Sequence, residues 1–224
     1  MSRHRARAAL SRTFYARPTL TVARQLLGKV LVHRAAAGLT SGKIVEVEAY
    51  IGEADPACHA APGPTRRNEP LYGEPGHAYV YFNYGVHDMF NVVTEPRGKP
   101  AAILVRALEP IDGIDVMQRR RSPKAEGGSR AAGDGRKAER RAEVPVDRLC
   151  RGPGNLARAM GITRTDNRAD LCAGDLFIED RGLAVGKIAR SSRVGIRVGV
   201  ERPWRFYVAG STAVSRGKVP RGSG

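Results

Sequence analysis

The amino-acid sequence predicts an α+β protein built as a single mixed domain. Its 224 residues suit one domain that buries about 70% of its unfolded surface. Strand and helix patterns follow one another in mixed order, without the regular alternation that builds a parallel sheet, and no internal repeat is present. The hydrophobic share of 42% and the charged share of 27% are those of an ordinary globular chain.

The first quarter of the chain predicts one helix and two strands. Apolar spacing favours a helix over residues 20–27, ended by Gly28, and a strand over 29–33. Residues 42–50 alternate as a second strand. One face of this strand carries Ile44, Glu46, Glu48 and Tyr50, and the other carries Lys43, Val45, Val47 and Ala49. The following connection, 52–76, is rich in Gly, Pro and Ala, and loops of this length usually carry function.

The rest of the chain predicts a hairpin and several shorter elements. Residues 78–82 and 86–93 form the two strands of the hairpin, joined by the Asn-Tyr-Gly turn at 83–85. The remaining elements are expected as strands over 101–108, 175–178, 187–198 and 205–208, and as helices over 112–121 and 153–161.

Composition sets the expected boundaries of the domain. Residues 1–18 predict a flexible basic arm, 19–215 the folded domain and 216–224 a tail. Residues 122–145 are polar, Gly-containing and densely charged, which predicts a disordered insert within the domain because so few apolar groups cannot offset the entropy of ordering.

Charge is the strongest compositional signal. The formal net charge is +16 and the pI is about 10.6, which favours a polyanionic partner such as nucleic acid but does not separate DNA from RNA. No apolar run approaches the ~20 residues that cross a bilayer, and residues 1–17 lack the apolar core of a secretory signal. We therefore expect an intracellular protein without a membrane partner.

The three cysteines predict reduced thiols. Cys58, Cys150 and Cys172 form no CxxC pair and cannot pair fully among themselves. The dipeptide Cys58-His59 resembles a metal-binding fragment, but no partner stands at ligand spacing, so we expect no metal site.

One strand carries a pair of residues suited to hydrolysis next to a planar group. Glu48 and Tyr50 share a face, so a carboxylate could activate water while the aromatic ring stacks. Taken alone, an acidic residue in a strand is a solvated surface group by roughly five to one. Tyr79, Tyr81 and Tyr84 are likewise, one by one, typical of hairpin packing.

Several motifs in a fixed order are more specific than any of these residues. They are KIVEVEAY at 43–50, YVYFNYG at 79–85, LVRALEP at 104–110, CRGP at 150–153, RVGI at 193–196 and RFYVAG at 205–210. Over about 20–211, the chain closely resembles the 3-methyladenine (alkyladenine) DNA glycosylase family, bacterial type. The resemblance implies a curved, mainly antiparallel, open-barrel-like sheet ringed by helices, with a DNA-intercalating hairpin.

The resemblance also implies a site. Glu48 would be the general base for the attacking water, which Arg106 and the backbone carbonyl of Val194 would help to hold. The residues that would bind the flipped base are Tyr50, His59 and Tyr81 as its sandwich, Leu71 and Leu104 as lining, and Asn91 at the pocket floor, where it would disfavour the exocyclic amine of normal guanine.

Further residues would contact DNA. Tyr84, in the hairpin turn, would be the wedge that enters the minor groove and fills the vacated stack. The other residues expected at the DNA are Thr65, Arg67, Gly152, Pro153, Gly154 and Asn155.

The implied reaction is that of a monofunctional DNA glycosylase. It would flip alkylated or deaminated purines (3-methyladenine, 7-methylguanine, hypoxanthine and ethenoadenine) and hydrolyse the N-glycosidic bond with a Glu-activated water. The product would be an abasic site in base excision repair. We expect no cofactor and no metal, double-stranded DNA with damaged purines as partner, a monomer, and a cytoplasmic location associated with the nucleoid through DNA.

Three alternatives remain beside this interpretation. A binding-only module would keep the fold without the chemistry, and an RNA-modifying enzyme would fit the charge equally well. A bifunctional lyase would need a lysine nucleophile, but Lys43 points to the face opposite Glu48. Glu46 shares the face of Glu48 one pleat further from Tyr50, so its replacement by Gln is expected to cost much less.

Overall fold

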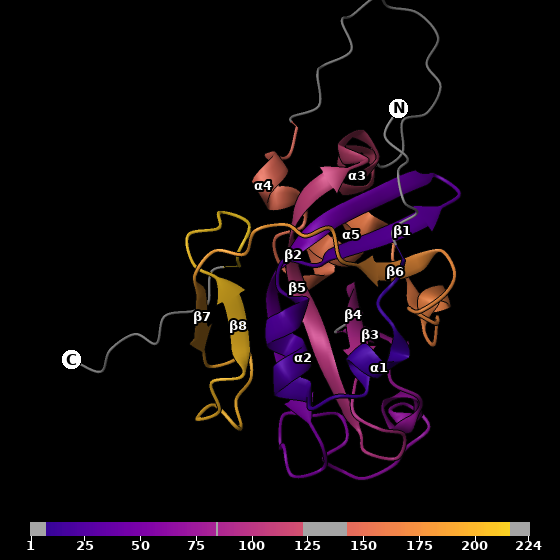
Figure 1. The fold of residues 1–224 in the computed structure, drawn as a ribbon, viewed down its shortest axis with the longest axis vertical. Helices are drawn as coiled ribbons and strands as arrows, with labels where there is room; N and C mark the ends of the chain where they lie inside the picture. Colours follow the sequence, from indigo (N-terminus) through magenta and orange to yellow (C-terminus); the bar gives the residue numbers. More distant parts are fainter. Residues whose placement is uncertain (1–7, 84, 123–142, 216–224) are drawn as a thin grey trace, which may run out of the picture.

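A curled antiparallel sheet dominates the fold (Figure 1). The structure is a computed structural model that describes residues 8–83, 85–122 and 143–215. The sheet order is β3-β4-β5-β2-β1-β6, and β8 pairs with both β2 and β7. Its strands are β1 Val30–Ala35, β2 Gly38–Ile51, β3 Ala78–Asn83, β4 His87–Val93, β5 Ala101–Asp112, β6 Leu176–Glu179, β7 Ile188–Ser191 and β8 Arg205–Val208. The predicted α+β class and half-open barrel shape are confirmed.

Short helices cover the sheet. They are α1 Arg12–Tyr15, α2 Thr19–Leu26, α3 Ile114–Arg121, α4 Val146–Leu149 and α5 Pro153–Met160, with the 3-10 turns η1 Glu69–Tyr72 and η2 Arg164–Asp166. Helix α2 packs on β2 and β5, and α5 packs on β4 and β5. The apolar face of α5 buries Leu156 and Met160 in the main core together with Phe90 of β4. No helix among the described residues is long and apolar enough to cross a membrane.

Strand β2 is the axis of the fold because it pairs with three neighbours. Along one edge it pairs with β5 almost from end to end; along the other it pairs first with β1 and then with β8. This change of partner lets the sheet curl, since β1 and β8 diverge from the same strand (Figure 1).

Two compensating bulges interrupt the β2–β5 ladder. Val45 of β2 and Arg106 of β5 have no partner in the ladder, whereas the residues on either side do. The first bulge corrects one expectation: Ile44 joins Val45, Val47 and Ala49 in the hydrophobic core instead of sharing the face of Glu46 and Glu48. Bulges re-aim side chains, and the second one directs Arg106 toward the carboxylates described below.

Several predicted elements are confirmed. The helix expected over 20–27 is α2, the hairpin strands are β3 and β4, and the helix expected over 153–161 is α5. Gly161 ends α5 in the left-handed conformation with φ 71°, as its position at the helix exit predicts.

Two predicted boundaries are wrong. The helix expected from 112 begins at Ile114, because β5 continues to Asp112 and Gly113 turns the chain at φ 73°. A Cβ on Gly113 would meet the carbonyl oxygen of Leu39 at 2.1 Å, so only glycine fits. The strand expected over 187–198 ends at Ser191, because Gly195 and Gly199 adopt φ of 79° and 64° and the segment turns inward to bury Arg193.

The expected flexible arm, 1–18, is wrong for residues 8–18. Tyr15 is fully buried in the core, and Arg12 forms an ion pair of 2.6 Å with Asp170. These contacts fix α1 against the domain. Residues 1–7, Tyr84, most of the expected insert (123–142) and the tail 216–224 lie outside the described residues.

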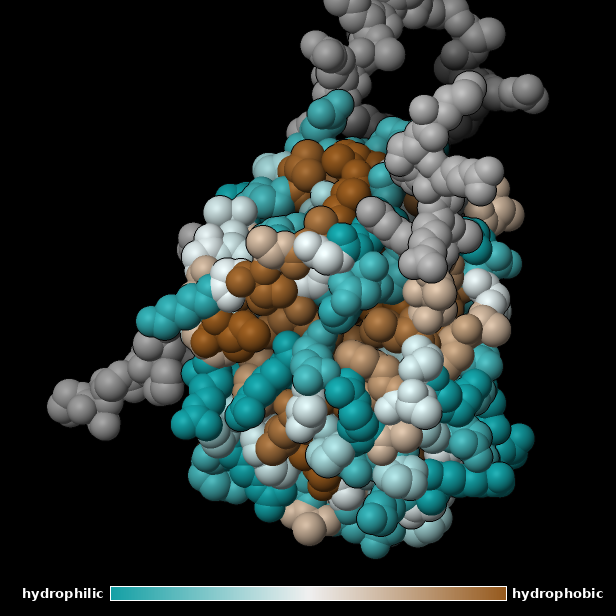
Figure 2. All heavy atoms as spheres, in the orientation of Figure 1, coloured by the Kyte–Doolittle hydropathy of each residue, from teal (hydrophilic) through white to brown (hydrophobic). Residues whose placement is uncertain are grey.

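Some apolar side chains stay at the surface. Val146 of α4 and Ile188 of β7 are exposed, and Figure 2 shows hydrophobic atoms gathered beside α3 and α4 and over β7 and β8. The lower half of the same face is mainly hydrophilic. Neither exposed residue lines the pocket described next.

Candidate active site

A pocket of about 320 Å³ opens where β2, β3, β4 and β5 meet the loops. It contains all six residues that the resemblance assigned to base binding: Tyr50, His59, Leu71, Tyr81, Asn91 and Leu104. Arg106, Pro153 and Val194 line it as well. Residues from distant parts of the sequence therefore meet in one concave, aromatic-rich site, the usual form of a small-molecule or base pocket.

An aromatic cluster forms one wall of the pocket. The rings of His59 and Tyr81 contact edge to face, with centroids 4.5 Å apart, and Tyr79 lies 5.4 Å from Tyr81. His59 Nδ1 lies 2.9 Å from the Tyr79 hydroxyl, which fixes the orientation of the imidazole. Burial, together with the nearby Arg67 cation, lowers the pKa of His59, so the ring is neutral at pH 7.

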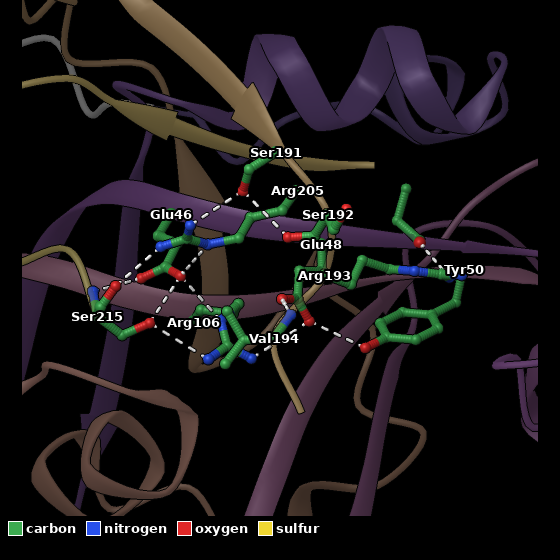
Figure 3. Close-up of polar contacts among 11 residues, drawn as sticks. Glu46, Glu48, Tyr50, Arg106, Ser191, Ser192, Arg193, Val194, Arg205 and Ser215 are labelled. Atoms are coloured by element: carbon green, nitrogen blue, oxygen red, sulfur yellow. Dashed lines mark hydrogen bonds and ion pairs between the residues drawn. The ribbon is translucent and has the colours of Figure 1, made fainter. Parts of the chain in front are cut away.

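Glu48 lies fully buried beside this pocket (Figure 3). Its carboxylate accepts hydrogen bonds from the backbone N–H of Val194 at 2.6 Å, the Tyr50 hydroxyl at 2.9 Å and Arg106 at 3.2 Å. Burial raises the pKa of Glu48 above its ordinary value although these three donors oppose the shift. A carboxylate with a raised pKa is a stronger base than a solvated one.

The contact of Val194 differs from the expected one. The resemblance assigned its backbone carbonyl to the water, whereas the contact that the structure shows is between its N–H and Glu48 Oε1. The role of the carbonyl stays a prediction.

A second buried carboxylate lies next to Glu48. Glu46 is fully buried and accepts hydrogen bonds from Arg106 Nε at 2.9 Å and Arg205 Nε at 2.7 Å. Ser215 adds its N–H and its hydroxyl, each at 2.7 Å. Although burial opposes ionisation, Arg106, Arg205 and Ser215 together hold the pKa of Glu46 below its ordinary value. The repeated carboxylate in KIVEVEAY is the signal for it, but Arg205 and Ser215 are too far along the chain to infer.

A buried ion pair lies behind Tyr50. Arg193 and Asp55 have no exposed side-chain surface and bind through two contacts of 2.5 and 2.8 Å. The Arg193 guanidinium carbon lies 4.6 Å from the centre of the Tyr50 ring and 5.3 Å from that of Trp204. This pair ties the loop before His59 to the segment that carries Val194. Sequence reasoning missed it, since a single Asp in a loop gives no signal.

The residues expected at the DNA take local structural contacts. Thr65 donates its N–H to Asn68 Oδ1 at 2.7 Å, and Arg67 lies 5.8 Å from the Tyr81 ring. At the start of α5, Gly152 is the N-cap with φ 89°, and Asn155 donates to the carbonyl of Arg151 at 2.8 Å.

Gly154, also at the start of α5, lies against β4. A Cβ there would meet the His87 ring at 2.6 Å, so glycine permits the close approach of this helix. Pro153 faces the pocket. Tyr84, the expected wedge, lies outside the described residues.

Neither a lysine nor a metal cluster occupies the site in the described part of the chain. None of the pocket-lining residues is a lysine, and Lys43 instead pairs with Glu109 at 2.7 Å. No group of three potential metal-ligating side chains occurs among the residues that the structure describes.

A buried carboxylate beside an aromatic pocket, in a chain of net charge +16, is typical of an enzyme that acts on a base of a nucleic acid. The chain belongs to the methylpurine-DNA glycosylase family, whose sequence profile matches residues 13–212. It is a DNA glycosylase, a hydrolase of N-glycosyl bonds that processes damaged bases in DNA repair.

Curated relatives agree with the family. A protein of Methanocella arvoryzae is 48% identical over 211 residues, covering 92% of this chain and 96% of the relative. Proteins of Chlorobium phaeobacteroides and Clostridium acetobutylicum are each 45% identical, covering 94% and 92% of this chain and 96% and 97% of the relatives. All three carry the name "Putative 3-methyladenine DNA glycosylase".

Proposed function

We propose that this glycosylase is monofunctional and that Glu48 activates the water that releases the base. The substrates would be 3-methyladenine, 7-methylguanine, hypoxanthine and ethenoadenine in double-stranded DNA, and the product an abasic site for base excision repair. The single observation that carries the proposal is the buried Glu48 carboxylate, held by three donors beside the aromatic pocket.

The charge of the site suits an oxocarbenium-like transition state. Hydrolysis of an N-glycosidic bond places positive charge on the sugar, which a nearby carboxylate stabilises while it also accepts a proton from water. A purine that alkylation has made cationic is already a good leaving group, so one strong base is enough. Arg106 and Val194 keep the Glu48 carboxylate in place for this task.

The pocket suits a planar, electron-poor base. The base would lie between Tyr50 and the wall formed by His59 and Tyr81, which is neutral and therefore does not repel a cationic ring. Asn91 is 4% exposed, and its amide donates to the carbonyls of Tyr79 and Met89 at 3.0 and 3.2 Å. A fixed amide at the floor would reject the exocyclic amine of guanine.

The remaining roles concern DNA. Tyr84, between β3 and β4, would fill the stack vacated by the flipped nucleotide, while Thr65, Arg67 and the start of α5 (152–155) would contact the backbone. The enzyme would act as a monomer without a cofactor.

The test uses duplex DNA with one lesion at a known position. The protein should convert it to an intact abasic strand that is nicked only after alkali, and sodium borohydride should trap no protein–DNA adduct. A trapped adduct would contradict a water nucleophile and favour a lyase. Excision from RNA but not from duplex DNA would favour the RNA-modifying alternative.

A further inference from the structure

Arg106 is shared between two buried carboxylates. It donates through Nε to Glu46 at 2.9 Å and through a terminal nitrogen to Glu48 at 3.2 Å (Figure 3). Its other terminal nitrogen donates to the Ser215 hydroxyl at 3.2 Å. The shorter contact goes to Glu46, so Arg106 is anchored mainly away from the pocket.

Glu46 does not face the pocket and is held from three directions. Arg106 comes from β5, Arg205 from β8 and Ser215 from the segment after β8. The two arginines and the two glutamates balance one another in charge. Each donor to Glu46 therefore affects how much of the Arg106 charge remains for Glu48.

We propose that Glu46 is a positioning residue that anchors Arg106 and limits its pairing with Glu48, which keeps Glu48 a strong base for the attacking water. This inference rests on the proposed function of Glu48. It replaces the expectation that Glu46→Gln costs little, because that expectation treated Glu46 only as a group further from Tyr50.

The neighbours of Glu48 set the sign of the effect. The charged and titratable groups around it are Glu46 and Tyr50 of β2, Arg106 of β5, Arg205 of β8, and Arg193. Glu46 raises the pKa of Glu48 and Arg106 lowers it. Removing the Glu46 charge frees Arg106 to pair more closely with Glu48, so the pKa of Glu48 falls and its base strength with it.

The test is the pH profile of single-turnover excision of 7-methylguanine, whose alkylated ring is cationic without protonation. Glu46→Gln should lower the maximal rate by about 10- to 100-fold, since a small displacement at the reacting centre costs on this order. The acidic limb of the profile should move to lower pH. A purely structural role would lower the amount of folded enzyme without moving this limb.

Glu109→Gln is the matched control. Glu109 is also paired with a cation, Lys43, and bonded to a serine hydroxyl, Ser211, but it lies outside the network. Its replacement should leave the rate and the limb unchanged. A Glu46→Gln enzyme with the wild-type rate and limb, beside an inactive Glu48→Gln enzyme, overturns this inference alone. Full excision by Glu48→Gln overturns the proposed function instead.

Ser215→Ala decides the matter if Glu46→Gln does not fold. This milder change removes one donor to Glu46 and one acceptor for Arg106, without removing a buried charge. It should shift the acidic limb in the same direction by a smaller amount. An unmoved limb in folded Ser215→Ala contradicts the proposal.

Discussion

Glu46 and Glu48 lie two residues apart on β2 and are both fully buried, yet their surroundings differ. Glu46 accepts four hydrogen bonds, two of them from separate arginines, and its pKa is lowered. Glu48 shares one arginine and accepts two neutral donors, and burial raises its pKa. Burial alone therefore does not decide the ionisation of a carboxylate; the number of cations that reach it does.

The difference separates two tasks on one strand. The Glu46 region, sealed by β8 and Ser215, holds a fixed negative charge. The Glu48 region borders the pocket and keeps a carboxylate whose charge is only partly compensated. Such under-compensated groups are typical of catalytic sites, where reactivity is gained at some loss of stability.

The largest expected effect is on chemistry at Glu48. Glu48→Gln keeps the shape of the side chain and removes the base, so excision should fall by at least about 10²–10⁴-fold while lesion binding is retained. Its thermal midpoint should not fall, because the change removes a charge that folding must desolvate. Single-turnover kinetics, a DNA-binding titration and thermal unfolding check the three parts. Loss of binding together with excision would make Glu48 a binding residue rather than a base.

A second buried pair extends the comparison to stability. Asp55→Asn leaves Arg193 buried without its counter-charge, which should cost about 3–5 kcal/mol of unfolding free energy. Asp115→Asn, in an exposed pair with Arg119, is the matched control and should leave unfolding unchanged. Denaturant titrations measure both. Equal stability of the two variants would show that the buried pair does not hold the loops together.

The smallest expected effect is the pH dependence of folding. Glu46 and Asp55 have folded pKa values below those of the unfolded chain, so the stability that they contribute is present above the unfolded pKa. It is lost as pH falls through the folded pKa, by at most about 1.4 kcal/mol per pH unit for each group. The thermal midpoint should therefore fall on acidification below the ordinary carboxyl range. Asp55→Asn should flatten this fall, and a slope equal to that of the wild type would contradict the assignment.

Sequence alone predicts the local part of this architecture. Strict alternation places Glu46, Glu48 and Tyr50 on one face of a strand, and the Gly161 exit fixes the end of α5. The family resemblance brought together the six residues of the base pocket, which the structure finds in one cavity.

The part that sequence could not predict depends on long-range contacts. The bulge at Val45 reverses the expected face of Ile44, and nothing in the local pattern signals it. Asp55 and Arg193 meet across 138 residues, and Ser215 reaches Glu46 across 169. These pairs exist only after β2 has its neighbours in place.

An NMR titration of the glutamate side-chain carboxyl carbons tests the central claim most directly. With the signals assigned through Glu46→Gln and Glu48→Gln, the account predicts that Glu48 titrates above the ordinary glutamate pKa and Glu46 below it. Titration of both carboxyls below the ordinary value, or the reverse order, would contradict the division of the strand into a reactive carboxylate and a fixed one.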